Sequence, residues 1–436
     1  KESLIWCGLF FVTEGMKVTV YVVVISVLIS GILASQQDKL DAFAKWADEN
    51  GFERKFDLVA IPGQGTGGIA TNSISANDVL LTVPKDKLVT TSSVIDINGW
   101  RGWTKVDEPL IIWVQREQFK GDASSWKAYI DILPESYSQH PLMWDNEDFK
   151  YMAILEAKVE LTRTTLEEDY ERIKSTLFAE FPDEFPLSHF TLERYIWAYL
   201  TVTTRAWAVT NGQGQLEMTL VPLADMLNHK VGNGEGGMNF DNSRFIINAT
   251  TTYAPGEQVY DSYGPKTNFQ LLSEYGFLPE TNPANGAVVS MQLNSQNIVH
   301  QHAIPMLKAS DPNYNQIKVT MYEVPQNLLR ICRITALKFS ELKELDNIIA
   351  YKAISLENEF KAFRIAVGAL ISAINQYPTQ EEEEALLASP DVTDRQKLTI
   401  RVRVGEKQVL ERQIETIKIL WQKILLDGEL LGGVAI

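Results

Sequence analysis

The sequence predicts an α+β protein in which short strands and helical segments precede a mostly helical C-terminal part. Three observations predict this class. Short apolar runs joined by tight turns fill residues 56–84, and a strand-like run recurs at 244–248. Apolar residues with a 3.6-residue period occupy most of 95–210. Amphipathic helical patterns dominate again from about residue 327 to the end.

Length and composition restrict the class of protein. A chain of 436 residues is expected to form two or three packed units. With 45% hydrophobic and 22% charged residues, the chain is globular and not disordered. A net charge of −16 argues against nonspecific nucleic-acid binding, which needs clustered Lys and Arg, and suits a locally basic partner. We therefore expect a protein partner, no nucleic acid, and a monomer.

Cysteine and histidine usage argues against a metal site. Cys7 and Cys332 are the only cysteines, too few for a disulfide framework or a cysteine-based zinc site. The five histidines show no HExxH spacing. His300 and His302 are two residues apart and would share one face of a strand, where we expect a structural or solvated role.

The N-terminal segment has the layout of a signal peptide. Met16 and Lys17 precede the uncharged run 18–34, and Ser35 follows it. We interpret residues 1–15 as lying upstream of the true start. The apolar run has about 17 residues, the lower limit for a membrane-spanning helix, so we favour a cleaved signal over a retained anchor. We expect entry into the secretory pathway, including to a plastid reached that way, with the cytoplasm as the alternative and membrane attachment only if the segment is retained.

The patterns also predict where individual elements lie. Leu40, Phe43 and Ala47 share a helical face that ends near residue 50. We expect strands at 56–61 and 79–84. Helical periodicity then marks four middle segments, at 110–114, 153–161, 166–178 and 192–208. In the C-terminal part we expect strands at 288–293 and 317–321, and helices at 336–349, 357–375 and 398–426. Acidic residues 381–384 predict a solvated helix start.

Residues 221–277 contain polar side chains in apolar surroundings. Asp225, Asn228 and His229 interrupt a run that otherwise has the composition of a buried segment. A second such place is 259–264, and a glycine-rich loop, 232–237, lies between them. Because buried polar groups cost free energy unless they find partners, we expect the two places to come together around a polar ligand.

Two upstream features could serve the same site. Gly65-Thr66-Gly67-Gly68 lets a backbone approach a ligand closely. No helix follows it, so the dinucleotide-binding fingerprint fails, and on these residues alone a simple turn is favoured. Arg205, followed by Trp207, ends the predicted helix 192–208. Arg205 either complements the helix C-terminus or binds a carboxylate.

Taken together and in order, three motifs resemble those of SET-domain methyltransferases. Residues 65–70, 225–229 and 260–264 resemble the family's G-x-G, N-H and Y-G motifs. The helical insert and the C-terminal half are similar to the Rubisco large-subunit methyltransferase branch. The likeness covers about residues 38–428. The C-terminal likeness rests on residues 356–359, 377–387 and 400–407.

The resemblance implies a domain organisation. The β-rich SET fold, with a knot-like crossing, would comprise residues 38–95 and 211–295. A helical insert would occupy 96–210, and a helical substrate-binding domain would occupy 296–436. Residues 1–35 would hold the upstream residues and the signal segment.

The resemblance also implies S-adenosylmethionine as the cofactor and assigns site residues. The cofactor-binding residues would be Gly65, Thr66, Gly67, Arg205, Asp225, Asn228, His229 and Phe277. The channel for the target side chain would be lined by Trp207, Ala224, Tyr260 and Tyr275. Tyr263 would be the catalytic residue, Arg205 would pair with the cofactor's carboxylate, and Phe277 would pack on its adenine. Gly68 departs from the pattern, since a larger apolar residue usually follows the G-x-G, and we expect this to loosen the turn.

The chemistry of methyl transfer agrees with this assignment. A lysine, with an ordinary pKa of about 10.4, must lose a proton before it can attack a methyl group. An aromatic channel beside a cationic sulfonium lowers that pKa through desolvation and like charge. Tyr263 can orient the amine, but a phenol with a pKa near 10 is not expected to act as a general base at neutral pH.

Three functions remain in competition. The first is a protein-lysine N-methyltransferase. The second is a protein-histidine N-methyltransferase, in which the resembling proteins have a carboxamide in place of Trp207 and a bulky residue in place of Ala224. An indole cannot accept a hydrogen bond from an imidazole, so Trp207 and Ala224 favour lysine. The third is a catalytically silent module that uses the same groove to hold a protein.

Overall fold

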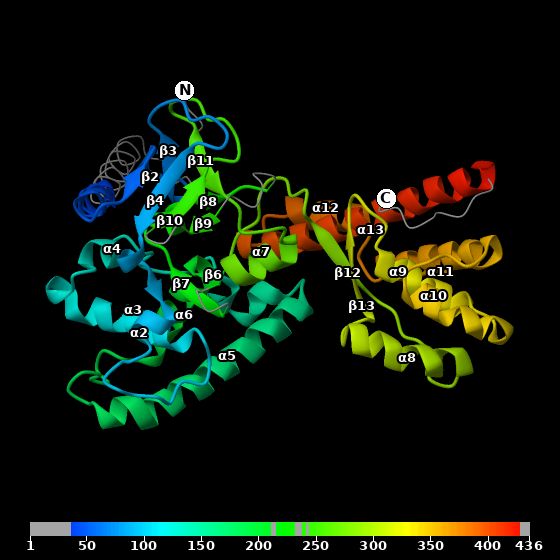
Figure 1. The fold of residues 1–436 in the computed structure, drawn as a ribbon, viewed down its shortest axis with the longest axis horizontal. Coiled ribbons are helices and arrows are strands. Elements are labelled where there is room, and N and C mark those ends of the chain that lie inside the picture. The colour runs from blue at the N-terminus through cyan, green and yellow to red at the C-terminus, as the bar shows by residue number, and fades with distance from the viewer. Residues whose placement is uncertain (1–35, 211–214, 232–237, 241–243, 428–436) are drawn as a thin grey trace, which may run out of the picture. The chain divides into compact units, whose positions relative to one another are not determined.

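The computed structural model describes residues 36–210, 215–231, 238–240 and 244–427. These form two compact units (Figure 1). The first comprises the described residues of 1–135, 176–229 and 235–261, and the second those of 136–175, 230–234 and 262–436. The predicted signal segment and the glycine-rich loop 232–237 lie outside the described residues. Within the described ranges, no helix has the length and apolar character needed to span a membrane. The domain boundaries given above stay a prediction.

The first unit contains three small sheets. Their strand orders are β1-β4-β10-β9, β2-β3-β11-β8 and β5-β7-β6. The strands are β1 (Glu53–Arg54), β2 (Phe56–Ile61), β3 (Gly65–Ala70), β4 (Val79–Pro84), β5 (Val89–Thr90), β6 (Trp207–Thr210), β7 (Leu216–Leu220), β8 (Asn228–His229), β9 (Met238–Phe240), β10 (Arg244–Asn248) and β11 (Gln258–Asp261). The predicted strands at 56–61, 79–84 and 244–248 are confirmed.

The first unit also contains helices. They are the helix at 36–49, α2 (Thr91–Val94), α3 (Glu108–Lys120), α4 (Lys127–Asp131) and α6 (Leu192–Arg205), with short 3-10 turns η1 (Lys85–Lys87), η2 (Gly121–Ala123) and η6 (Ala224–Met226). Leu40, Phe43 and Ala47 are buried on one face of the first helix, as predicted. The prediction that a helix continues to residue 208 is wrong. Backbone pairing of Trp207 with Thr219 on β7 replaces the helical hydrogen bonds after Arg205.

The second unit is mostly helical. Its elements are α5 (Ala153–Ile173), α7 (Asn268–Tyr275), α8 (Ile298–Ser310), α9 (Gln326–Ala336), α10 (Leu345–Ile349), α11 (Leu356–Ile374), α12 (Gln380–Ala388) and α13 (Asp394–Asp427), the antiparallel strands β12 (Gly286–Ser290) and β13 (Gln316–Thr320), and the 3-10 turns η3 (Pro141–Met143), η4 (Asn146–Phe149) and η7 (Phe339–Glu344). The helices predicted at 357–375 and 398–426 are confirmed as α11 and α13. The two predicted at 153–161 and 166–178 are a single helix, α5, followed by a π-helical turn, Lys174–Phe178.

Two predictions for the C-terminal part are wrong, and a third holds only in part. The segment 336–349 is not one helix, because Leu337 is extended and separates α9 from η7 and α10. His300 and His302 lie on helix α8 and not on a strand, and His302 contacts the carbonyl of Ile298 one turn earlier. The acidic run does begin helix α12, but Glu383 within it is buried and pairs with Arg403.

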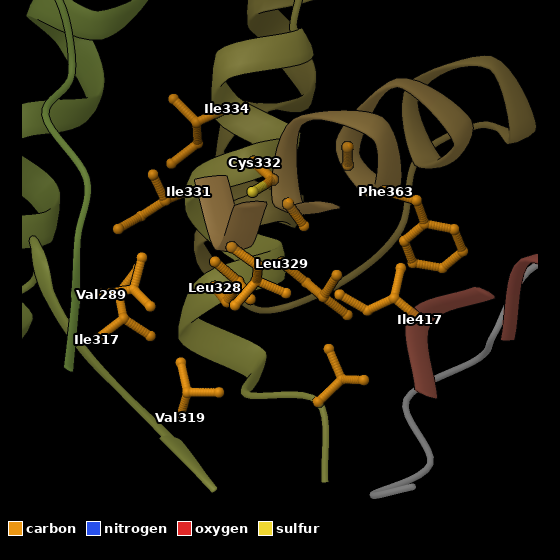
Figure 2. Close-up of a cluster of buried hydrophobic side chains, with 14 of the residues drawn as sticks. Val289, Ile317, Val319, Leu328, Leu329, Ile331, Cys332, Ile334, Phe363 and Ile417 are labelled. Carbon is orange, nitrogen blue, oxygen red and sulfur yellow. The ribbon is translucent and has the colours of Figure 1, made fainter. Parts of the chain in front are cut away.

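The hydrophobic core of the second unit forms around α9 (Figure 2). Leu328, Ile331 and Cys332 lie among side chains from β12, β13, α11 and α13. Burial raises the pKa of the Cys332 thiol to about 12, so this cysteine is a core residue without nucleophilic character at neutral pH. Among the described residues, no group of three or more His, Cys, Asp or Glu side chains is placed to hold a metal ion.

Candidate functional site

A part of each of the three sequence motifs lies on one sheet of the first unit. In the order β2-β3-β11-β8, strand β3 carries the G-x-G residues and the two-residue strand β8 is Asn228–His229 (Figure 1). Strand β11 runs antiparallel to β3 and parallel to β8. Asn228 is the register partner of Tyr260, and His229 that of Asp261. The two polar stretches singled out in the sequence, around Asn228 and at 259–264, therefore come together through the pairing of β8 with β11, as expected.

The G-x-G backbone is closely packed at Gly67. A Cβ atom there would lie 2.4 Å from Ile61 Cδ1, 3.0 Å from Asn228 Nδ2 and 3.1 Å from Gln258 Nε2. Only glycine fits this place without displacing a neighbour. Gly65 has open space around it but a left-handed φ of +75°, which also favours glycine. Thr66, between them, is half-buried and pairs with Ala60 on β2.

The departure at Gly68 has a packing explanation. A Cβ atom on Gly68 would come within 2.7 Å of Phe56 Cδ2 and 2.9 Å of Leu227 Cδ2. These two large side chains fill the space that a larger residue at 68 would need. The expectation that Gly68 loosens the turn is therefore wrong, since the glycine is what permits this close packing.

Buried polar atoms mark the segment just before and within β8. Asn228 Nδ2 and Asp225 Oδ1 are buried and have no hydrogen-bond partner among the described residues. Leaving a buried donor or acceptor unpaired costs about 1–3 kcal/mol. Asn228 Nδ2 lies close to Gly67, and such an unpaired donor indicates a place where a polar ligand would supply the missing partner.

Arg205 binds the segment that contains Asp225. Its Nη1 donates to the backbone oxygen of Asp225 at 2.8 Å and lies 3.8 Å from the Asp225 carboxylate. Arg205 is the last residue of α6, three residues before the predicted helix end at 208, and its Nη1 lies near one oxygen of the Asp225 carboxylate. Burial raises the pKa of Asp225 to about 6, against the opposing effects of Arg205 and of a hydrogen bond from Tyr129.

The predicted channel residues of the first unit lie on β6, η6 and β11. Trp207 begins β6, and its ring meets that of Phe245 at 72° with centroids 5.8 Å apart. Ala224 is buried in η6. Tyr260 donates its hydroxyl to Gln258 Oε1 at 2.9 Å.

Sequence reasoning missed three residues of this region. Gln258 Nε2 donates to Gln64 Oε1 at 3.3 Å, which links β11 to the turn before β3. Tyr129 donates to Asp225 from 96 residues away. Glutamine and tyrosine belong to no motif at these positions, so no local signal could have found them.

The second unit places the other three predicted residues together. Tyr263 and Tyr275 stack with ring centroids 4.9 Å apart, and Phe277 approaches both at 6.4 and 6.3 Å. Tyr275 ends helix α7, which Thr267 caps. Gly276 follows with a φ of +80° and turns the chain so that Phe277 can face the tyrosines. The trio forms an aromatic surface of the kind that accommodates aliphatic and cationic groups.

Charged side chains border this aromatic trio. Lys266 Nζ lies 5.3 Å from the Tyr275 ring centroid and pairs with Glu274 at 2.9 Å. Lys158 Nζ donates to Ser273 Oγ at 2.8 Å, and burial lowers its pKa. The His140 backbone lies against Gly276, and burial lowers the pKa of the His140 side chain to about 4. His140 is therefore neutral at physiological pH, and its Nδ1 accepts from the Leu142 amide.

Comparison with solved structures identifies the fold. The structure of Rubisco LSMT bound to AdoMet aligns with a TM-score of 0.67 at 22% sequence identity, covering 90% of this chain and 97% of that one. A crystal structure of the SET domain of LSMT bound to lysine and AdoHcy aligns with a TM-score of 0.69 at 22% identity, covering 89% and 93%. The chain has the fold of Rubisco LSMT. The predicted α+β class is thereby confirmed, while the knot-like crossing stays a prediction.

Sequence comparisons agree with the LSMT fold. Residues 297–410 match the family model of the Rubisco LSMT substrate-binding domain. Curated relatives named actin-histidine N-methyltransferase, from Homo sapiens and from Callithrix jacchus, are 26% identical over 427 residues, which is 88% of this chain and 69% of each relative. The resemblance predicted from the three motifs is confirmed. The relatives' name supports the histidine alternative more directly than the lysine interpretation.

Proposed function

We propose that the protein is an S-adenosylmethionine-dependent protein methyltransferase that modifies a side-chain nitrogen of a protein substrate. The observation that carries the proposal is the meeting of Gly67, Asn228 and Tyr260 on one sheet, with a buried amide donor left for a ligand. The LSMT fold, the relatives' name and the matched substrate-binding domain support it.

The residues of the first unit suit such a cofactor. Gly65 leaves open space beside the β3 backbone, and Gly67 lets the Asn228 side chain approach that backbone closely. Asn228 Nδ2 and Asp225 Oδ1 have no hydrogen-bond partner among the described residues. We assign cofactor binding to the set predicted from the sequence, namely Gly65, Thr66, Gly67, Arg205, Asp225, Asn228 and His229 of the first unit, together with Phe277 of the second unit. When bound, S-adenosylmethionine supplies a methyl group on a positively charged sulfur. Arg205 is a suitable partner for a carboxylate because its guanidinium is always charged.

The side chains of this protein then bind, orient and desolvate the nucleophile. Tyr263, stacked on Tyr275, presents a phenol that can accept a hydrogen bond from an amine and fix the direction of its lone pair. In an in-line displacement, alignment of the reacting atoms supplies much of the rate. Aromatic walls exclude water and lower the pKa of a lysine amine, which favours the neutral form that attacks.

Two nucleophiles are supported by different observations. Lysine is favoured by Trp207 and Ala224, because an indole packed on Phe245 offers no acceptor for an imidazole N–H. Histidine is favoured by the relatives, whose name states that activity. The two options share the cofactor site and the protein substrate, and they differ only in the atom that is methylated.

The proposal also covers substrate binding, the oligomeric state and the cellular location. We propose that the domain matched at 297–410 binds the protein substrate and that the chain acts as a monomer. We also propose entry into the secretory pathway through residues 16–35. Sequencing the N-terminus of the mature protein would test this, since a cleaved signal predicts a start near residue 35.

Replacing the phenol tests the proposed catalytic role. Tyr263→Phe keeps the ring stack and removes the hydroxyl, so turnover should fall by about tenfold or more, the scale expected for one positioned catalytic group. The dissociation constant for S-adenosylmethionine should change by less than about threefold, because the cofactor set excludes Tyr263. Transfer of a labelled methyl group to proteins of a native extract and calorimetry of cofactor binding give the two readings.

The matched control is Tyr151→Phe, which removes the hydroxyl of a half-buried tyrosine outside residues 297–410 in the same unit and keeps the ring that faces Arg403. This variant should keep full activity. Undiminished transfer by Tyr263→Phe would remove Tyr263 from the mechanism. A wild-type chain that binds no S-adenosylmethionine would leave the silent binding module as the better description.

A further inference from the structure

The helical insert contributes a buried hydroxyl to the segment before the N-H motif. Tyr129, on the short helix α4, has no solvent exposure. Its hydroxyl donates to Asp225 Oδ2 at 2.6 Å, a bond that joins residues 96 positions apart. Short bonds to a carboxylate are among the stronger hydrogen bonds in proteins. The bond therefore fixes the direction of a side chain three residues before Asn228.

The same carboxylate oxygen faces Arg205. Oδ2 of Asp225 lies 3.8 Å from Arg205 Nη1, and the same nitrogen donates to the Asp225 backbone oxygen at 2.8 Å. Tyr129 from α4 and Arg205 from α6 are thus the titratable or charged side chains that act on Asp225. The second carboxylate oxygen, Oδ1, is buried without a partner among the described residues.

The turn that carries Asp225 is conformationally strained. Leu223, two residues earlier, has a φ of +77°, which a residue with a branched side chain seldom adopts. Such a conformation persists only where the surroundings hold it. Backbone hydrogen bonds hold this turn, from the Asp225 amide to the Val221 carbonyl at 3.1 Å and from the Met226 amide to the Leu223 carbonyl at 3.3 Å. The Tyr129 and Arg205 side chains add hydrogen bonds to Asp225 itself.

We propose that Tyr129 is a positioning residue for the cofactor site: its hydroxyl orients the Asp225 carboxylate, which holds Arg205 and sets the turn that presents Asn228. The inference rests on the proposed function and adds to it a residue of the insert. Through Asp225, Tyr129 would set the direction of the guanidinium that the proposed function assigns to the cofactor's carboxylate.

The arrangement has a consequence for pH. Burial raises the pKa of Asp225 to about 6, while the Tyr129 hydroxyl favours the ionised carboxylate. Only the ionised form attracts Arg205, so cofactor affinity should decrease as the pH falls through about 6. Without the Tyr129 hydroxyl the pKa of Asp225 should rise further, and this loss of affinity should begin at a higher pH.

Calorimetry of S-adenosylmethionine binding from pH 5 to 8 tests the inference. Tyr129→Phe should raise the dissociation constant by about tenfold at pH 6.5, the lower end of the effect of losing a hydrogen bond to a charged group. Its pH midpoint should move up by about one unit. Tyr195→Phe, which removes an equally buried hydroxyl from α6 but leaves the bond to Asp225, should keep the wild-type midpoint.

Asp225→Asn provides a second variant should Tyr129→Phe fold poorly. It removes the titrating group and should make affinity independent of pH in this range. An unchanged midpoint in Tyr129→Phe, or a pH dependence retained in Asp225→Asn, would overturn the inference and leave the proposed function standing. Absence of binding by the wild-type chain at every pH would overturn the proposed function and this inference with it.

Discussion

At the scale of single residues, the glycines of this chain meet two different requirements. Gly67 and Gly68 are glycines because neighbouring side chains occupy the place of a Cβ atom. Gly65 and Gly256 are glycines because their φ is left-handed, although the space around them is open. Gly276 meets both requirements, since its φ is +80° and a Cβ atom would lie 2.8 Å from His140 Cα.

Gly276→Ala should therefore be strongly destabilising. We expect the free energy of unfolding to fall by about 1–3 kcal/mol from overpacking against the His140 backbone, in addition to about 1–2 kcal/mol for the left-handed conformation. Because Gly276 lies between Tyr275 and Phe277, methyl transfer should fall as well. Denaturant unfolding measures the first effect. Gly256→Ala carries the conformational cost alone, so equal losses in both variants would show that the His140 contact contributes nothing.

At the scale of elements, α9 and α11 are joined by a buried ion pair. Arg333 donates from Nε and Nη2 to the two carboxylate oxygens of Glu359 at 2.7 and 2.6 Å, and both side chains are almost fully buried. Arg333 also donates to the carbonyl of Tyr351 at 3.0 Å. The geometry is bidentate, which is the arrangement that best offsets the cost of desolvating two charges.

Removing one partner of this ion pair should lower the free energy of unfolding more than replacing both partners with apolar residues. Glu359→Ala leaves the Arg333 charge buried, and the free energy of unfolding should fall by about 3–5 kcal/mol. The double variant Arg333→Met with Glu359→Leu should recover much of that loss, because no buried charge remains. Glu357→Ala, at an exposed position on the same helix, should have a much smaller effect. A double variant no more stable than Glu359→Ala would contradict this account of the α9–α11 contact.

At the scale of the whole molecule, the sequence predicted those features that depend on local pattern or on motif order. Strands such as β2 and helices such as α11 and α13 follow the hydrophobic periodicity closely. The order of the three motifs predicted the fold that comparison with Rubisco LSMT confirms. The resemblance could likewise name Tyr263 and Asn228 as site residues before their surroundings were known.

Other features depended on tertiary contacts that no local pattern contains. Trp207 is in a strand because β7 pairs with it, although its own neighbours continue the helical period. Glu383 is buried because Arg403, 20 residues later, provides a partner. Tyr129 acts on Asp225 across 96 residues. In each case a partner distant in sequence determined the outcome, and a single sequence does not reveal such partners.

Identification of the methylated atom tests whether this chain transfers a methyl group to a side-chain nitrogen of a protein. The wild-type chain would be incubated with labelled S-adenosylmethionine and a native protein extract, and the modified residue would be mapped by mass spectrometry. We expect a methyl group on a side-chain nitrogen of a protein. It should be on lysine if Trp207 and Ala224 determine the nucleophile, and on histidine if the chain acts as its relatives' name states. Absence of labelled protein, or label found only on carboxyl groups, would contradict it.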